Sequence, residues 1–356
     1  MMRNIVLLIL GFWTCALSSK AGNVSHFYPA NHSYIQYTGR VDFSTPTKPK
    51  IWASGAYLQI KFSGSFCMLQ VNDELLWGKV NNYLTVKIDD QPAYRIQLKG
   101  KENELILGKD LNEGVHTVLV CKSTESENGY IEILGITCEK LLKQQAKPPR
   151  RIEYIGDSIT CGAGSDESQV KCGDGEWHHQ HNAYQAYGPT TSRSLNAQWH
   201  LSSVSGIGLM HSCCGKKIVM PQVFDKVNMA KDSIKWDFSL YQPDVVSICL
   251  GQNDGVQDSV LFTSAYVKFA KTLRTYYPKA KLIFLSSPMA STELKQALVK
   301  YLTAVEEKMI ADGDHNVGKY IFTQQYHKGC GSHPSVAEHT EIATELTAYL
   351  KKTMKW

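Results

Sequence analysis

The sequence predicts an α/β protein: a C-terminal α/β/α domain with a mainly parallel sheet, preceded by an N-terminal β-sandwich of jelly-roll type. Up to about residue 142, apolar and polar residues alternate with a period near two, which is typical of strands with one buried face. Beyond about residue 151, short apolar runs alternate with amphipathic stretches, which indicates a parallel sheet covered by helices. The 356 residues, 43% hydrophobic and 20% charged, suffice for two globular domains.

The first 21 residues are predicted to be a signal peptide. Arg3 precedes an apolar run from Ile5 to Leu17, and the small residues Ser19 and Ala21 have the spacing of a cleavage site. The run is too short to favour a bilayer span. We therefore expect a secreted or periplasmic protein without a membrane span.

The charge distribution argues against a nucleic-acid partner, and the cysteines indicate disulfides rather than a zinc site. The net charge is +5 with scattered Lys and Arg, so no nucleic-acid partner is expected. Ten cysteines in an exported chain indicate disulfides, and loss of Cys15 with the signal peptide leaves an odd number, nine. Cys249 lies in an apolar run and is predicted to be a buried free thiol. There is no C-x-x-C pair, so no structural zinc is expected.

The β-sandwich is predicted to span residues 22–142, with a linker at 143–151 that contains Pro148-Pro149. Trp52 and Trp77 are expected to pack in its core, although either could bind carbohydrate. Six segments have the alternating pattern of strands: 57–64, 66–73, 83–90, 93–100, 116–123 and 130–138.

The second domain is predicted to span residues 152–356. Ligands of such domains bind at the carboxyl ends of the parallel strands, and this rule directs the search for a site. The expected strands are 151–156, 199–205, 244–251, 281–287 and 319–324, and the expected helices are roughly 184–195, 259–276, 291–311 and 335–352.

A candidate nucleophile follows the first of these strands, in the stretch "YIGDSITCG". Gly156 and Gly162 permit a tight turn on either side of Ser158. A hydroxyl on such a turn can face a cleft, although a serine there can also simply cap a helix.

A serine nucleophile needs a base, and His333 is the candidate. It precedes Pro334, which suits the first turn of the final helix. This places His333 after the fifth strand, at the same edge of the sheet as Ser158. The alternative is a surface or helix-cap histidine.

Acyl transfer also needs donors for an oxyanion. The N–H of Gly206 follows the second strand, and the side chain of Asn253, in "LGQNDG", follows the third. Each alone is typical of a turn. Four such elements after separate strands of one domain favour an acyl-transfer site.

Together, Gly-Asp-Ser, the later glycine, Gly-x-Asn-Asp and His-Pro resemble the SGNH (GDSL-type) hydrolase superfamily over about residues 150–354. The resemblance implies that Ser158 is the nucleophile and His333 the base. It implies an oxyanion hole made by the N–H groups of Ser158 and Gly206 and the side chain of Asn253. No cofactor and no metal are implied.

With a β-sandwich in front, the chain is most similar to the acetyl xylan esterases of carbohydrate esterase family 2. This resemblance implies an exported serine esterase that removes O-acetyl groups from plant cell-wall xylan or glucomannan through an acetyl-enzyme. Its partner would be an acetylated polysaccharide or oligosaccharide. The alternatives are another SGNH esterase (a lipase, a thioesterase or a sialate O-acetylesterase) and a non-catalytic carbohydrate-binding protein.

The sequence departs from the superfamily three residues before His333, where Cys330 stands in place of a usual aspartate. The resemblance to family 2 implies a serine–histidine dyad in which a main-chain carbonyl holds the imidazole N–H. An acid from elsewhere, such as Asp174 or Glu176, is an alternative. Cys330 could instead form a disulfide, with Cys214 and Cys172 as candidate partners.

One aromatic loop, residues 172–188, could form a wall of the cleft. Trp177 in this loop could stack on a sugar ring or be a half-packed loop residue. His178, His179 and His181 lack helical i, i+4 spacing, so no metal is expected there.

Overall fold

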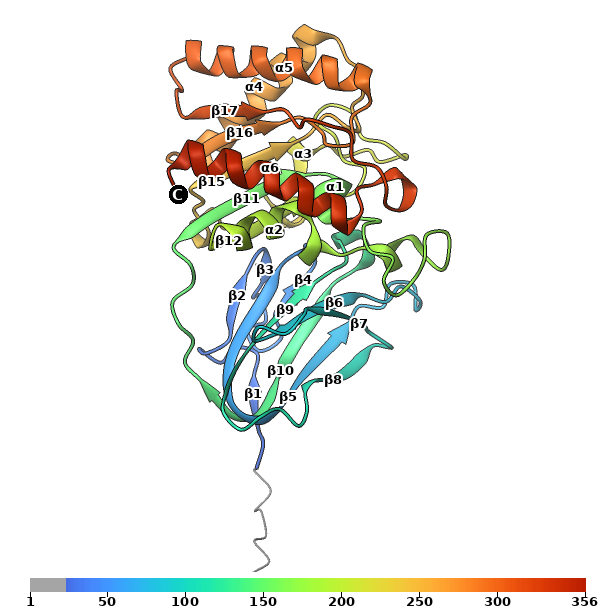
Figure 1. Cartoon of the computed structure of the whole chain (residues 1–356), viewed down its shortest axis with the longest axis vertical. Helices are drawn as coiled ribbons and strands as arrows, with labels where there is room; N and C mark the ends of the chain where they lie inside the picture. The colour runs from blue at the N-terminus through green and yellow to red at the C-terminus, as the bar shows by residue number, and fades with distance from the viewer. Residues whose placement is uncertain (1–23) are drawn as a thin grey trace, which may run out of the picture.

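The computed structural model describes residues 24–356, so the predicted signal peptide and Cys15 lie outside the described residues. Figure 1 shows an antiparallel β domain at one end of the molecule and a domain of parallel strands and helices at the other. The predicted fold class is confirmed.

The N-terminal domain is organised around β5 (Tyr57–Asp73), which is 17 residues long. β5 pairs with β10 (Ile131–Leu142) on one side and with β8 (Glu102–Gly108) and β9 (Val115–Lys122) on the other, all antiparallel. Alternate residues of β5 are buried and face the core, as expected of a pleated strand. The other strands are β1 (His26–Pro29), β2 (Gln36–Thr38), β3 (Val41–Asp42), β4 (Lys50–Ile51), β6 (Tyr83–Ile88) and β7 (Tyr94–Gln97).

Three expectations for this domain need correction. The segments 57–64 and 66–73 are one continuous strand, because the intervening residue stays extended. β8 was not predicted. Trp52 is buried as expected, but the side chain of Trp77 is 79% exposed, because it lies on the loop between β5 and β6 rather than in a strand.

The second domain has a five-stranded parallel sheet in the order β12-β11-β15-β16-β17. In chain order this is the 2-1-3-4-5 arrangement, whose ligand crevice lies where the strand order reverses. The strands are β11 (Arg150–Gly156), β12 (Ala197–Ser203), β15 (Val245–Cys249), β16 (Lys281–Leu285) and β17 (Val317–Tyr320).

Four longer helices cover this sheet. α4 (Ser259–Tyr276) and α5 (Thr292–Ala311) contact each other and pack on one face, while α2 (Tyr187–Ser194) and α6 (Val336–Met354) pack together on the other. α4, α5 and α6 begin at side-chain caps that the sequence supplies: Asp258, Ser291 and Ser335 each accept a backbone N–H of the first turn. Shorter elements are α1 (Ser158–Cys161), α3 (Met220–Val223), β13 (Lys226–Asn228), β14 (Ser233–Lys235), η1 (Ser126–Asn128), η2 (Trp177–Gln180), η3 (Ala183–Gln185), η4 (Phe238–Leu240) and η5 (Cys330–Ser332).

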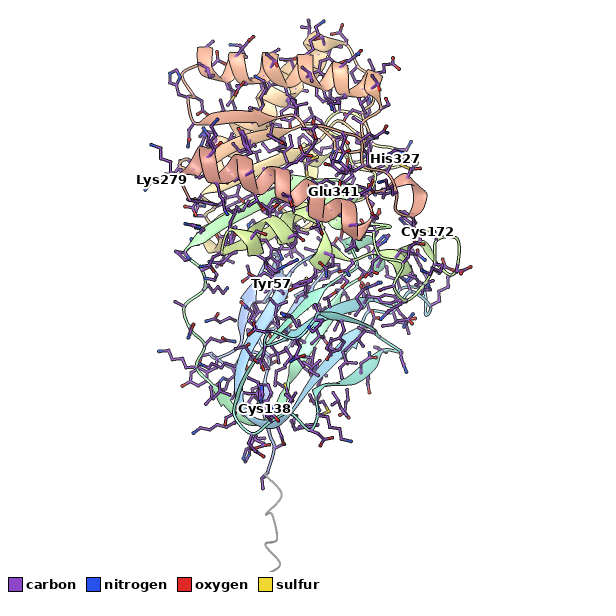
Figure 2. All side chains as sticks on the ribbon, viewed as in Figure 1. Tyr57, Cys138, Cys172, Lys279, His327 and Glu341 are labelled. Atoms are coloured by element: carbon purple, nitrogen blue, oxygen red, sulfur yellow. A yellow bond between two sulfur atoms is a disulfide. The ribbon has the colours of Figure 1, made fainter. Side chains whose placement is uncertain are left out.

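The two domains share a buried interface. Tyr57, labelled in Figure 2, packs its ring 4.1 Å from that of Trp199. Arg40 reaches from the β domain into the second domain, where it donates to Glu153 at 3.2 Å and to the carbonyls of Phe224 and Lys226. Both members of the Arg40–Glu153 pair are fully buried.

The described helices include none that is long and apolar enough to cross a membrane. The predicted domain limits, including the linker at 143–151, stay predictions; in the structure, residues 143–149 run between β10 and β11 without a helix or strand.

Replacing Arg40 should destabilise the protein strongly. Arg40→Ala leaves the carboxylate of Glu153 buried without its cation, and breaking a buried pair in this way costs about 3–5 kcal/mol. Urea unfolding followed by circular dichroism measures the change in the free energy of unfolding. Lys271→Ala, which breaks the half-exposed pair with Asp312, is the control and should cost less than about 1 kcal/mol. Equal losses in the two variants would contradict the prediction.

Candidate active site

The candidate residues meet because three strands end level with one another. Gly156, the last residue of β11, pairs with Ser203 at the end of β12 and with Cys249 at the end of β15. Ser158 follows β11 and lies two residues beyond this edge, while Gly206 and Asn253 follow β12 and β15. The structure therefore brings the three segments to one crevice of the sheet, as the carboxyl-end rule predicts.

Ser158 is the first residue of α1, a single turn that begins at Asp157 and ends at Gly162. The side chain of Asp157 accepts the N–H of Ile159 at 3.0 Å and so holds the start of the turn. Because the first N–H groups of a helix have no partner within it, the N–H of Ser158 has no acceptor within α1. Ser158 is 8% exposed.

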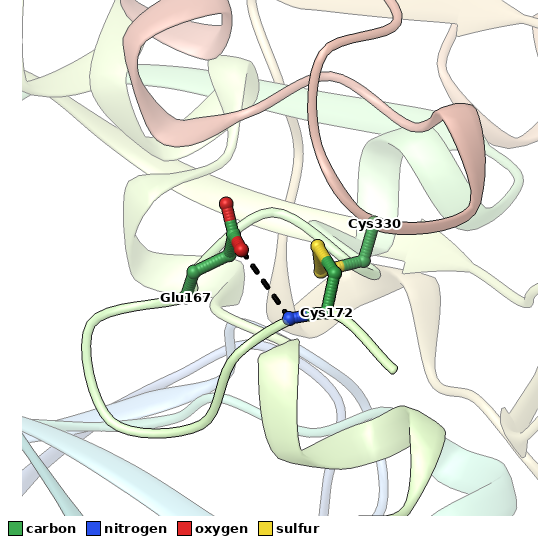
Figure 3. A group of neighbouring side chains, drawn as sticks. All are labelled: Glu167, Cys172 and Cys330. Carbon is green, nitrogen blue, oxygen red and sulfur yellow. Dashed lines mark hydrogen bonds between the residues drawn. A yellow bond between two sulfur atoms is a disulfide. The ribbon is translucent and has the colours of Figure 1, made fainter. Parts of the chain in front are cut away.

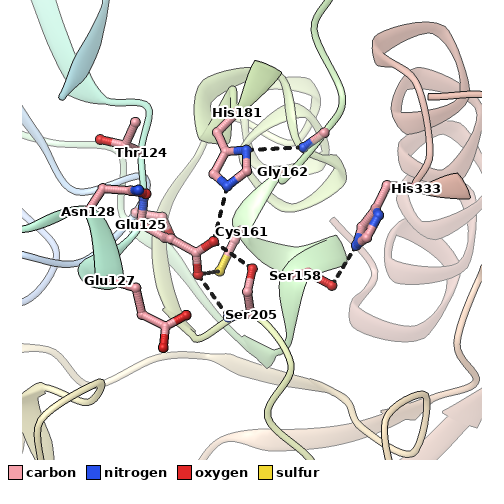
Figure 4. A network of polar contacts seen from close by, with 12 residues as sticks. Thr124, Glu125, Glu127, Asn128, Ser158, Cys161, Gly162, His181, Ser205 and His333 are labelled. Carbon is pink, nitrogen blue, oxygen red and sulfur yellow. Dashed lines mark hydrogen bonds and ion pairs between the residues drawn. The ribbon is translucent and has the colours of Figure 1, made fainter. Parts of the chain in front are cut away.

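Ser158 and His333 contact each other directly. The Oγ of Ser158 lies 2.8 Å from Nε2 of His333 (Figure 4). Nδ1 of the same ring lies 3.1 Å from the carbonyl oxygen of Gly331. A carbonyl only accepts hydrogen bonds, so Nδ1 carries the hydrogen and Nε2 is free to accept the serine proton. Burial lowers the pKa of His333 below its usual value, against a smaller raising effect of the Gly331 carbonyl. The ring is thus neutral at neutral pH.

The loop before His333 is shaped by a glycine and a disulfide. Gly331 has a φ of +58°, a left-handed conformation that glycine adopts freely, and this turns its carbonyl toward the histidine ring. Cys330 is bonded to Cys172, which selects one of the two predicted partners (Figure 3). The other candidate, Cys214, is paired with its neighbour Cys213.

The two alternative acids do not orient His333. Within residues 24–356, no carboxylate lies at ion-pair distance from its ring. Glu176 instead caps η2 together with His179. The carboxylate of Glu167 accepts the N–H of Cys172 at 3.2 Å beside the disulfide (Figure 3), and the bonded sulfurs are not available to a metal.

The three candidate oxyanion donors differ in their present bonding. Gly206 has a φ of +74°, and no acceptor for its N–H is found among the described residues. The side-chain amide of Asn253 already donates to Asp157 at 3.0 Å and to the carbonyl of Ile207 at 2.9 Å. Asn253 can therefore donate to an oxyanion only by sharing or giving up one of these bonds.

Asp157 and Asp254, which belong to the two sequence motifs, accept hydrogen bonds that fix nearby loops. Asp254 accepts the N–H groups of Leu209, Met210 and His211 at 2.6–2.9 Å and so fixes the loop after Gly206. Burial raises the pKa of Asp157 to about 7, and its second oxygen accepts from Asn253.

Trp177 lines the site. Its ring is 44% exposed and lies 5.2 Å from the ring of His333 and 5.3 Å from that of His181. Stacking on a sugar stays a prediction. His178 and His181 are buried, and the ring of His178 lies 4.7 Å from that of His179. Among the described residues the three loop histidines form no cluster of metal-ligating atoms.

Sequence reasoning missed one group of site residues. Glu125, from the β domain, is buried against Ser205 and His181 (Figure 4). No motif marks Glu125, because it lies in a polar stretch between β9 and η1 of the other domain.

Comparison with known proteins identifies the family of both domains. Residues 37–148 match the family model of the carbohydrate esterase 2 N-terminal domain, and residues 154–316 match that of the GDSL-like lipase/acylhydrolase family. The chain is 31% identical over 332 residues to the cellulase/esterase CelE of Acetivibrio thermocellus, and it spans 90% of its own length but only 40% of CelE. It is 26% identical over 364 residues to an acetylxylan esterase / glucomannan deacetylase of Cellvibrio japonicus, covering 99% and 98% of the two chains.

Solved structures agree. A family two carbohydrate esterase from Clostridium thermocellum in complex with cellohexaose superposes with a TM-score of 0.82 at 30% identity, covering 90% of this chain and 99% of that one. A family two carbohydrate esterase from Cellvibrio japonicus gives 0.85 at 25% identity, covering 94% and 99%. Both domains match their family models in order, and the Clostridium thermocellum structure is 30% identical and almost fully covered. The chain therefore belongs to family 2 of the carbohydrate esterases, with a second domain of the GDSL type, and is a carboxylic ester hydrolase.

Proposed function

We propose that the protein is an exported serine esterase that removes O-acetyl groups from plant cell-wall polysaccharide through the dyad of Ser158 and His333. The 2.8 Å contact between Ser158 Oγ and His333 Nε2 is the observation that carries the proposal. Export is proposed from the N-terminal sequence, and the substrate class from the relatives.

In the first half of the reaction, Nε2 of His333 takes the proton of Ser158 while Oγ attacks the acetyl carbonyl. The Gly331 carbonyl holds the Nδ1–H, so the ring keeps the required tautomer and orientation as it becomes positively charged. The bond between the acetyl carbon and the sugar oxygen then breaks, and the imidazolium gives its proton to that oxygen, which leaves as a hydroxyl. The acetyl group stays on Ser158.

The oxyanion that forms on the acetyl oxygen would be bound by the N–H groups of Ser158 and Gly206, with Asn253 as a third donor. Among residues 24–356 the first two have no hydrogen-bond acceptor, so they need not give up a bond to bind the oxyanion. In the second half, His333 activates water, which attacks the acetyl-enzyme and releases acetate.

The substrate class rests on the relatives. The two Cellvibrio japonicus relatives are both acetylxylan esterases / glucomannan deacetylases, and a Clostridium thermocellum relative binds cellohexaose. Each of these is a property of the relative, and together they favour an acetylated plant polysaccharide over a lipid or thioester for this chain. The intact serine–histidine contact favours catalysis over binding alone.

Ser158→Ala should abolish turnover. Removing the nucleophile of such a unit typically lowers kcat by about 10⁶-fold, so acetate release should fall to background. The measurement is acetate released from acetylated xylan, acetylated glucomannan and simple acetyl esters.

Ser192→Ala is the matched control. It removes a serine hydroxyl that bonds Tyr154 away from the site. It should keep turnover near that of the wild type. Near-normal turnover in Ser158→Ala would contradict the dyad, and faster turnover of long-chain than of acetyl esters would favour a lipase instead.

The pH dependence of kcat/KM should report the lowered pKa of His333. The ring must be neutral to accept the serine proton, and burial holds its pKa below the usual 6.5 of histidine. Activity should therefore rise with pH through a midpoint below 6.5 and be on its plateau by pH 7. A midpoint above 7 would contradict the assignment.

A further inference from the structure

We propose that Glu125, a residue of the β domain, is a positioning residue of the esterase site that fixes both the oxyanion loop and the loop of His333. The inference rests on the proposed function for its chemistry and on the following contacts for its geometry. Glu125 does not touch Ser158 or His333, so it acts through the residues that it binds.

Glu125 is bound as an anion. It is 3% exposed, and burial alone would raise its pKa, but the hydrogen bonds that it accepts from His181 and Ser205 lower the pKa. A buried carboxylate that accepts hydrogen bonds from several donors holds those donors in place. Moving any one of them away would leave the buried negative charge with too few hydrogen bonds, which is energetically costly.

The first branch of contacts reaches the oxyanion loop. The N–H of Ser205 donates to Glu125 at 2.8 Å, and the Oγ of Ser205 donates at 2.5 Å. Both bonds come from Ser205, the residue directly before Gly206. The N–H of Gly206 is the candidate donor to the oxyanion. Fixing Ser205 at two points therefore fixes the peptide that carries this N–H.

The second branch reaches the base. Nε2 of His181 lies 3.2 Å from Glu125, and Nδ1 of the same ring accepts the N–H of Gly164 at 3.2 Å. Since Nδ1 accepts, His181 is neutral and donates from Nε2 to the carboxylate. The carbonyl of Gly164 in turn accepts the N–H of Cys330 at 2.8 Å, three residues before His333.

A packing contact joins the same parts. The ring of Trp177 lies between His181 and His333. A Cβ at Gly331 would lie 3.0 Å from that ring. A shift of His181 would therefore move the surface against which the catalytic ring packs.

Besides its positioning role, the charge of Glu125 acts on His333 through space, without a contact. A negative charge behind the ring favours the imidazolium and raises the pKa of His333, while a charge on His181 would lower it. Lys122 donates from Nζ to the carbonyl of Glu125 at 3.0 Å, and burial lowers the pKa of Lys122 to about 7. Other titratable groups that interact with Glu125 are Cys161, Asp157 and Glu127.

The test uses the full-length chain with Glu125→Gln. The amide keeps the size of the side chain but replaces one carboxylate oxygen with an NH₂ group. At least one of the donors from Ser205 and His181, which use both oxygens of Glu125, therefore loses its acceptor. We expect kcat for an acetyl ester to fall about 10- to 100-fold per active site, with KM changed less than about threefold. The acid limb of kcat/KM should move to lower pH, because the variant removes the negative charge that raises the pKa of His333.

The matched control is Glu127→Gln, which removes a carboxylate two residues away that pairs with Lys216 at the surface of the same interface. It should leave kcat and the acid limb unchanged. Active sites are counted with a fluorophosphonate, so a loss of folded protein is not mistaken for a loss of kcat. Ser205→Ala, which removes only the Oγ contact, provides a second variant if Glu125→Gln does not fold, and should lower kcat about 10-fold.

Glu125→Gln overturns the inference if it keeps both the wild-type kcat per titrated site and an unmoved acid limb of kcat/KM. If Ser205→Ala is used in its place, wild-type kcat per titrated site overturns the inference. A wild-type protein that hydrolyses no acetyl ester would refute the proposed function and not this inference. In that case the rate of Ser158 modification by the fluorophosphonate decides: a slower rate in Glu125→Gln than in Glu127→Gln supports the positioning role, and equal rates overturn it.

Discussion

The hydrogen bond from the Nδ1–H of His333 to the carbonyl of Gly331 is the contact on which the rest of the candidate site depends. It fixes the tautomer that leaves Nε2 facing Ser158. A neutral carbonyl stabilises an imidazolium less than a carboxylate does. The site therefore combines a base of lowered pKa with a loop that must be held by other means: the left-handed Gly331 and the disulfide of Cys330.

Because the loop before His333 must be held in position, residues outside the loop form hydrogen bonds with it. The carboxylate of Glu338, in the last helix, accepts the N–H groups of His327 and Lys328 and so holds the start of the segment that leads to His333. Gly164 accepts from Cys330 on the other side. The loop is tied to the final helix, the nucleophile turn and the aromatic loop at once, although it has little regular structure of its own.

Much of this could be predicted from sequence, and the reasons differ by element. The meeting of Ser158, Gly206 and Asn253 was predictable because a parallel sheet brings the residues after its strands together. A helix was predicted at roughly 259–276, where the structure has α4. The disulfide of Cys330 was one of two open alternatives, because sequence spacing does not determine connectivity. Trp77 was misplaced because a tryptophan in a β-rich stretch is usually buried, whereas here it lies on a turn. Glu125 could not be found, since its role depends on how two domains pack.

The buried carboxylate of Glu125 also bears on how such enzymes can be recombined. The two domains match separate family models, which suggests modules that could be exchanged one by one. A GDSL-type domain transferred alone would leave Ser205, His181 and Glu153 without the partners that the β domain supplies. The two domains therefore have to be transferred together. The 332-residue match to the much longer CelE includes both of them.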